Sequence, residues 1–192
     1  MSIDTTIIAP DLYRWTVQEF QQMVTAGILE EDDKVELLNG QIVYMSPVGR
    51  FHAACVSMLN EWFFQTLKRA YIIRVQDPIV LDNLSEPEPD IVIAKRKADY
   101  YAQGLPKPED VRLIVEVADS SLAKDKGVKL PLYAAAGIQE YWLINVSKEQ
   151  LEIYTLPTEK GYTGQQVYQI PDQLDHELLG SFTIKQLFPW LT

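Results

Sequence analysis

Residues 111–118 read Val-Arg-Leu-Ile-Val-Glu-Val-Ala, a nearly continuous run of apolar and β-branched side chains. Such a run is typical of a β-strand that is covered on both faces of a sheet. Glu116 interrupts it. Because burial of an unpaired carboxylate is costly or raises its pKa, this residue predicts a positively charged partner nearby.

A second strand is expected upstream, at residues 91–94, which read Ile-Val-Ile-Ala. The acidic, proline-rich connection 83–89 leads Asp90 into the start of this strand. Short β-branched or alternating stretches predict further strands at residues 71–75, 78–81, 141–146, 151–156, 167–170 and 182–184. The chain therefore has enough strands for a central sheet.

Two helices are predicted before this group of strands. Residues 52–69 carry apolar side chains at intervals of three and four, the spacing of one helix face. Residues 16–26 show the same spacing, and Thr16 with Glu19 forms a capping-box pattern that marks the start of a helix.

A third helical segment is expected between residues 119–121, which resemble a helix start, and Gly137, which ends it. Pro131 lies inside this segment. Either the helix kinks at the proline, or its regular part begins only near Lys129.

Residues 34–45 predict a β-hairpin, because Asn39-Gly40 is the strongest dipeptide signal for a two-residue turn. With that turn, Glu36 pairs with Val43 and lies on a partly apolar face of the hairpin. This is an unusual place for a carboxylate.

These elements predict a mixed α/β (α+β) fold, in which helices flank a central sheet in the order αβββαβ. The N-terminal helix and the hairpin are additions to that core. Residues 1–11 are expected to form a flexible arm, and residues 12–192 a single domain.

The chain is acidic, with a formal net charge of −10 from 17 basic and 27 acidic residues. This argues against a protein that holds nucleic acid by bulk electrostatics, because duplex DNA would be repelled at long range. It does not exclude a nuclease, since a carboxylate-lined site becomes locally positive when a divalent metal binds.

No apolar run approaches the roughly 18 residues that a membrane span requires. The first residues lack the basic and apolar regions of a signal peptide. The single cysteine, Cys55, excludes an intramolecular disulfide and is expected to be a small buried residue of a helix. We therefore expect a cytoplasmic protein without a membrane partner.

Asp90 and Glu116 enter the same predicted sheet, and Lys126 and Lys129 follow in the next helical segment. Two carboxylates with water form the oxygen environment that Mg²⁺ prefers. A nearby ammonium group can stabilise developing negative charge or, if its pKa is lowered, help deprotonate a water molecule. These are the parts that phosphodiester hydrolysis requires.

The order Pro89-Asp90 and then Glu116-Val117-Ala118 resembles the PD-(D/E)XK nuclease superfamily. There the lysine usually lies two residues after the second acid, where this chain has Ala118, but in a known form the lysine has moved to the following helix. More narrowly, about residues 12–190 are similar to the mainly cyanobacterial "putative restriction endonuclease" family named Uma-two. The similar stretches are ELLNG at 36–40, MSP at 45–47, His52, EPEPDI at 86–91, VEV at 115–117, DKGVK at 125–129 and YAAAGIQEYW at 133–142.

The resemblance implies a restriction-endonuclease-like core and a DNA endonuclease that depends on Mg²⁺ or Mn²⁺. It implies Asp90 and Glu116 as metal ligands and Lys129 as the catalytic lysine. Glu36 and His52 become pocket residues that orient metal or water. A homodimer is expected, because nucleases that cut both strands match the two-fold symmetry of the duplex.

Structural roles remain open for each of these residues. Lys129 is also placed to pair with Asp125 on its own helix, and Lys126 is the other candidate for the catalytic lysine. Glu36 fits a simple hairpin pair, and His52 fits a surface or capping position. The simplest expectations for other residues are core packing for Tyr133, Tyr141 and Trp142, and solvated loop charges for Glu86 and Glu88. Tyr133 lies four residues after Lys129, so a position in the same pocket stays open as the alternative for this residue.

Two other functions remain open. One is a non-catalytic module that uses a nuclease fold to bind a protein or nucleic acid, which the absence of a lysine at position 118 favours. The other is a metal-dependent hydrolase of small phosphorylated substrates. No glycine-rich phosphate loop is present, so action driven by a nucleotide is not indicated.

Overall fold

The computed structural model describes residues 12–191, and the predicted arm 1–11 lies outside the described residues. Its centre is a six-stranded sheet in the order β3-β4-β5-β6-β7-β8. The strands are β3 (Tyr71–Val75), β4 (Ile91–Lys95), β5 (Val111–Ala118), β6 (Glu140–Asn145), β7 (Gln150–Thr158) and β8 (Gly161–Gln169). Neighbouring strands are antiparallel except β5 and β6, which are parallel. The predicted mixed α+β class is confirmed.

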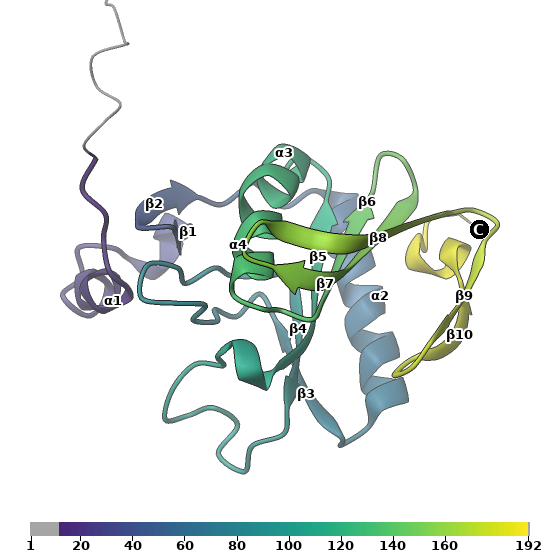
Figure 1. The fold of residues 1–192 in the computed structure, drawn as a ribbon, viewed down its shortest axis with the longest axis horizontal. Coiled ribbons are helices and arrows are strands. Elements are labelled where there is room, and N and C mark those ends of the chain that lie inside the picture. Colours follow the sequence, from purple (N-terminus) through teal and green to yellow (C-terminus); the bar gives the residue numbers. More distant parts are fainter. Residues whose placement is uncertain (1–11, 192) are drawn as a thin grey trace, which may run out of the picture.

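Helices cover both faces of this sheet (Figure 1). On one face lies α2 (Arg50–Leu67), whose Leu59 and Phe63 are fully buried against strand residues such as Val115. On the other face lies α4 (Leu130–Ala135), whose Tyr133 is fully buried in a second core.

The alternation of β5 places Glu116 on the α4 face. Val115 and Val117 belong to the core that includes α2, whereas Ile114 and Ala118 belong to the core that includes α4. Ile91 at the start of β4 pairs with Val115, so the residue before it, Asp90, lies beside Glu116. Strand register therefore brings the two predicted acids together.

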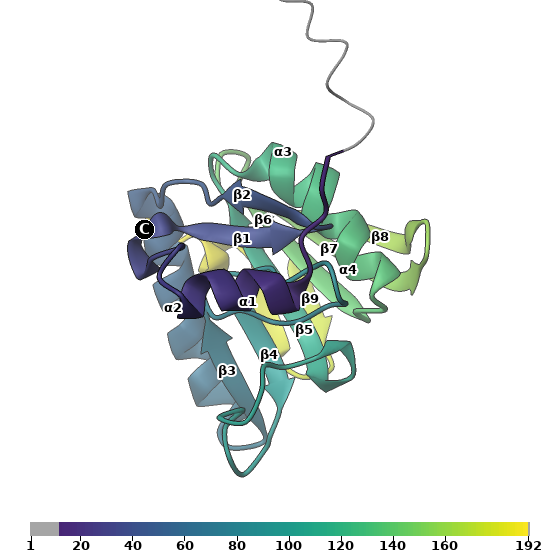
Figure 2. The same ribbon diagram turned by 90° about the vertical axis from the view of Figure 1, so that its left-hand side faces the viewer.

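The predicted hairpin forms with the predicted register, in which Glu36 faces Val43. It consists of β1 (Val35–Leu38) and β2 (Gln41–Tyr44), which lie beside α1 (Val17–Thr25) in front of the central strands (Figure 2). The capping box that opens α1 is present. Leu37 of β1 exchanges two backbone hydrogen bonds with Glu86, which attaches the hairpin to the segment that precedes Asp90.

The third helical segment is irregular in its middle. It consists of α3 (Leu122–Lys124), a π-helical turn η4 (Asp125–Lys129) and then α4. The N–H of Leu130 donates to the carbonyl of Asp125, five residues earlier. Pro131 has no N–H to donate to the carbonyl of Gly127, which favours the wider turn. The second of the two predicted forms, in which the regular helix begins near Lys129, is confirmed.

One strand prediction was wrong. Residues 78–81 are not a strand, because Ile79 and Leu81 donate their N–H groups to the neighbouring loop residues Pro87 and Ser85. The strand expected at 167–170 exists as the end of β8, which begins at Gly161. The short strand β9 (Gln173–His176), which pairs with β10 (Gly180–Thr183), has a mostly polar sequence without the alternation that would predict it.

Three short 3-10 helices complete the described fold: η2 (Glu31–Asp33), η3 (Pro108–Asp110) and η5 (Ile184–Leu187). Cys55 is fully buried in α2, as expected, and burial raises the pKa of its thiol to about 12. None of the helices between residues 12 and 191 combines the length and apolar character needed to cross a lipid bilayer.

Gly40 in the hairpin turn offers a test of this arrangement. Its φ is +79°, and a Cβ atom there would lie 2.6 Å from the Cβ of Arg14. Gly137 has a similar φ of +80°, but a Cβ there would meet no atom within 4 Å. Gly137→Ala should therefore lower the free energy of unfolding by about 1 kcal/mol through backbone strain alone.

Gly40→Ala should lower the free energy of unfolding by at least about 1 kcal/mol more than Gly137→Ala, because a steric clash with Arg14 adds to the same backbone strain. Urea denaturation of both variants measures the difference. Equal losses would show that the approach of Arg14 to the hairpin is not tight.

Candidate active site

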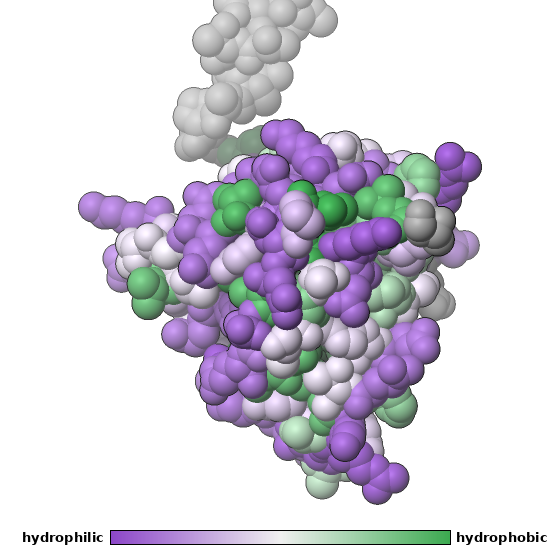
Figure 3. Space-filling view, turned by 90° about the vertical axis from the view of Figure 1, so that its right-hand side faces the viewer, coloured by the Kyte–Doolittle hydropathy of each residue, from purple (hydrophilic) through white to green (hydrophobic). Residues whose placement is uncertain are grey.

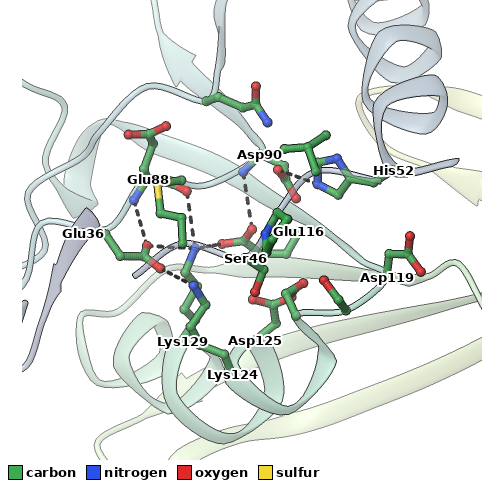
Figure 4. Close-up of a pocket in the computed structure, with 16 residues that line it drawn as sticks. Glu36, Ser46, His52, Glu88, Asp90, Glu116, Asp119, Lys124, Asp125 and Lys129 are labelled. Carbon is green, nitrogen blue, oxygen red and sulfur yellow. Dashed lines mark hydrogen bonds and ion pairs between the residues drawn. The ribbon is translucent and has the colours of Figure 1, made fainter. Parts of the chain in front are cut away.

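A small recess lies where Asp90, Glu116 and the third helical segment meet (Figure 4). Its volume is about 50 Å³. Since one water needs roughly 10–15 Å³ of such volume, the recess has room for an ion with a few waters. All five predicted site residues line it: Glu36, His52, Asp90, Glu116 and Lys129.

The two predicted metal ligands are adjacent. The N–H of Asp90 points to Oε2 of Glu116 at 3.4 Å, and the N–H of Val117 donates to Oδ2 of Asp90 at 2.8 Å. The Asp90 side chain therefore links the residue before β4 to β5.

His52 reaches the same recess from the first turn of α2. Its Nε2 lies 2.9 Å from Oδ1 of Asp90, and the side chain is nearly buried. Burial alone would lower the pKa of His52, but the hydrogen bond and charge of Asp90 raise it above its ordinary value. The expectation of a surface or capping histidine is wrong, and His52 holds one oxygen of Asp90 in place.

Lys129 is the central cation of the recess. Its Nζ lies 2.9 Å from Oε1 of Glu116 and 3.0 Å from Oε2 of Glu36, and it donates to the carbonyl of Glu88 at 3.3 Å. Burial alone would lower the pKa of Lys129, but the carboxylates of Glu116, Glu36 and Asp125 together raise it. The lysine therefore stays charged although its side chain is almost completely buried.

Lys126 does not line the recess, and Lys129 does not form the alternative pair with Asp125. Lys126 points away from the recess and forms an ion pair with Glu152 at 2.7 Å. The carboxylate of Asp125 accepts a hydrogen bond from the hydroxyl of Ser121 rather than pairing directly with Lys129. The choice of Lys129 over Lys126 as the site lysine agrees with this geometry.

Glu36 is buried in the recess and is held by two ammonium groups. Its Oε1 lies 2.8 Å from Nζ of Lys124, and its Oε2 accepts from Lys129 and, at 3.2 Å, from the N–H of Glu88. Burial raises the pKa of Glu36, but Lys129 and Lys124 outweigh this effect and lower it overall. Glu36 is therefore ionised, and its carboxylate faces the recess and pairs with two lysines rather than with a residue of the hairpin.

The π-helical turn explains how two lysines on one helix reach one carboxylate. In a regular α-helix, residues five apart point about 140° from each other. The extra residue in the turn Asp125–Lys129 rotates Lys129 back towards the side of Lys124. Sequence reasoning missed Lys124: it expected an irregularity around Pro131, but the type of turn, which decides which lysines share a side, cannot be read from the sequence.

The two carboxylate oxygens of Glu116 differ in their hydrogen bonds. Oε1 accepts hydrogen bonds from Nζ of Lys129 and, at 2.8 Å, from the hydroxyl of Tyr133. Among the described residues, Oε2 has only the long contact with the N–H of Asp90. Tyr133, for which core packing was favoured over contact with the pocket, does both, because it is buried in the second core and its hydroxyl group orients Glu116.

The recess holds more acid groups than its ammonium groups balance. Full burial raises the pKa of Glu116 well above its ordinary value, and Lys129 opposes this shift only in part. Burial likewise raises the pKa of Asp125. Glu88 and Asp119 also line the recess, and sequence reasoning assigned neither to it. An additional cation would be stabilised here.

Two loop acids were expected to be solvated, and this was wrong. Glu86 is 7% exposed and its Oε2 accepts from Nε2 of Gln21 at 2.7 Å. Glu88 is partly buried, and burial raises its pKa. Both residues are drawn inward because the segment that contains them pairs with β1.

The carboxylates of the recess suit a divalent ion that keeps part of its water shell. Residues 12–191 contain no group of three His, Cys, Asp or Glu side chains already placed around a common metal position. Two adjacent carboxylates do fit Mg²⁺ or Mn²⁺, because such ions often keep several waters and use only one or two protein carboxylates. Asp90 and Glu116 are the residues that would hold the ion.

Glu36 provides a test of the electrostatics. Because the pKa of Glu36 is lowered in the folded state, its ionised form stabilises the fold above the pKa of an unfolded glutamate, near 4.5, and this contribution disappears as the pH falls below that value. Glu36→Gln should therefore lower the free energy of unfolding by about 3 kcal/mol at pH 7.

The difference from the unchanged chain should shrink when the pH is lowered below about 4.5. Urea denaturation at several pH values measures it. Glu61→Gln, on the exposed side of α2, is the control and should change stability by less than about 0.5 kcal/mol. A loss for Glu36→Gln that is independent of pH would contradict the ion-pair account.

Comparisons with known proteins agree with this architecture. The chain resembles, with a TM-score of 0.71 and 18% identity, the crystal structure of a "putative nuclease belonging to DUF820" from Anabaena variabilis, over 92% of this chain and 99% of that one. At this identity the likeness shows a shared fold. No curated protein matches the chain. The family model Uma2, described as "Putative restriction endonuclease", matches residues 17–186, and the chain belongs to this family.

Proposed function

We propose that this protein is a metal-dependent endonuclease that hydrolyses phosphodiester bonds of DNA. The observation that carries the proposal is the convergence of Asp90 and Glu116, from separate strands, on one recess in which the ammonium group of Lys129 contacts Glu116. The family description and the fold support the same class of enzyme.

Asp90 and Glu116 would hold Mg²⁺ or Mn²⁺, with the open Oε2 of Glu116 as one ligand atom. When bound, such an ion polarises a phosphoryl oxygen and lowers the pKa of a coordinated water. His52 donates a hydrogen bond to Oδ1 of Asp90 and so fixes the orientation of that ligand.

Lys129 supplies positive charge beside the position where negative charge develops on the phosphoryl group. Its three N–H groups are already used by Glu36, Glu116 and the Glu88 carbonyl. The bond to the carbonyl is the longest, at 3.3 Å, and is the one most easily exchanged for a phosphoryl oxygen. Glu36 keeps Lys129 in place during that exchange.

A second candidate is a non-catalytic binding module. It is favoured by the complete internal pairing of Lys129 and by the absence, within residues 12–191, of a prearranged group of three metal-binding side chains. In that case the acids and lysines would serve only to stabilise the fold.

The two candidates differ in a plasmid-nicking assay with and without Mg²⁺ or Mn²⁺. The endonuclease should nick only with the divalent ion, and Glu116→Gln should lower the rate by on the order of a thousandfold or more. The folded state should survive, because the substitution removes a carboxyl group that burial already disfavours in its charged form.

The two lysines of the π-helical turn provide matched variants. Lys129→Met should abolish nicking, whereas Lys126→Met removes an equally close ion pair outside the recess and should leave the rate within about twofold. Thermal denaturation checks that each variant is folded. Metal-dependent nicking that survives Glu116→Gln, or no nicking in the unchanged chain, would contradict the proposal.

A further inference from the structure

A second cavity, of about 410 Å³, adjoins the candidate active site. Glu36, Gln76 and Glu88 line both the recess and this cavity. Its walls come from α1, β1 and the segment between β3 and β4. A group bound in the second cavity would therefore lie next to a phosphate at the recess.

One wall of the second cavity is apolar. It is formed by Phe20, Val24, Leu29, Val35 and Pro78. Phe20 is almost fully buried in a small core with Leu37, whereas Val24 is 52% exposed and lies at the rim. This wall suits a flat, weakly polar group such as an aromatic ring.

The polar lining of the second cavity is acidic. It contains Glu30, Glu36, Glu86 and Glu88, against the single cation Lys34. A phosphate would be repelled, whereas a group with N–H donors would find acceptors. The contacts of Glu86 with other described residues occupy only its Oε2, which leaves Oε1 for a ligand.

Gln76 stands at the junction of the two cavities. Its φ is +53°, a strained value for a residue other than glycine, and its N–H donates to the carbonyl of Asp90 at 3.1 Å. Its side-chain amide is exposed and forms no hydrogen bond with the described residues. An amide offers both a donor and an acceptor to the edge of a base.

We propose that the second cavity binds an unpaired nucleobase with an exocyclic amino group, next to the phosphate that occupies the recess. This inference rests on the proposed nuclease function and specifies its substrate as single-stranded or locally unpaired DNA. A base within a duplex is stacked and paired, so it could not enter a cavity walled on several sides. A carboxylate that accepts from an amino group is an established mode of base recognition.

On the face in Figure 3, hydrophobic side chains lie in small separate groups among hydrophilic ones. The second cavity combines an apolar wall, unused acceptors and a shared border with the recess.

The test is an NMR titration of the ¹⁵N-labelled full chain with two pyrimidine nucleosides, without metal. Deoxycytidine carries an exocyclic amino group and thymidine does not. Deoxycytidine should shift the amide signals of Leu29, Val35 and Gln76, and thymidine should bind about tenfold more weakly or less. Because nucleosides lack phosphate, the result does not depend on hydrolysis.

Val24→Trp should fill the cavity from its exposed rim and abolish these shifts. Val167→Trp is the matched control, because Val167 is 47% exposed on β8, and it should leave binding unchanged. Equal shifts with both nucleosides, no shifts with either, or shifts that survive Val24→Trp would overturn the base-binding site. If metal-dependent nicking were present in that case, the nuclease function would still stand.

Discussion

The candidate site depends on one buried interaction, the contact of the Lys129 ammonium group with both Glu36 and Glu116. These carboxylates come from the hairpin and from β5, so the lysine joins its own helical segment and β5 to a hairpin that is far away in the sequence. A buried charge is tolerated only when it is paired and hydrogen-bonded, which makes the position of each of the three residues depend on the other two. The pocket therefore forms only when the hairpin, sheet and third helical segment are all in place.

Most of the fold could be predicted because local signals agreed with the tertiary structure. The Asn39-Gly40 turn fixed the register of the hairpin, and the capping box fixed the start of α1. Alternation and register in β5 were sufficient to bring Asp90 beside Glu116. The strand at 78–81 failed because those residues bond to a loop, and β9 was missed because its polar sequence carries no periodic signal.

Five residues that line the recess were predicted from the sequence, whereas most contacts among the lining residues were not. Asp90, Glu116, Lys129, Glu36 and His52 all line the recess, whereas the roles of Lys124 and Tyr133 depend on the π-helical turn and on packing across the sheet. Such contacts between distant segments leave no pattern in a single sequence. The acid groups of the recess also account for part of the net charge of −10. They surround a position that is suited to a cation.

The central claim is that Asp90 and Glu116 bind one divalent ion beside Lys129. The most direct test is the anomalous difference map of a crystal of this protein soaked in Mn²⁺. The account predicts a peak between the two carboxylates, in contact with Oε2 of Glu116, while Oε1 stays bonded to Lys129 and Tyr133. A map without a peak there at saturating Mn²⁺, with the same ion pairs unchanged, would contradict it.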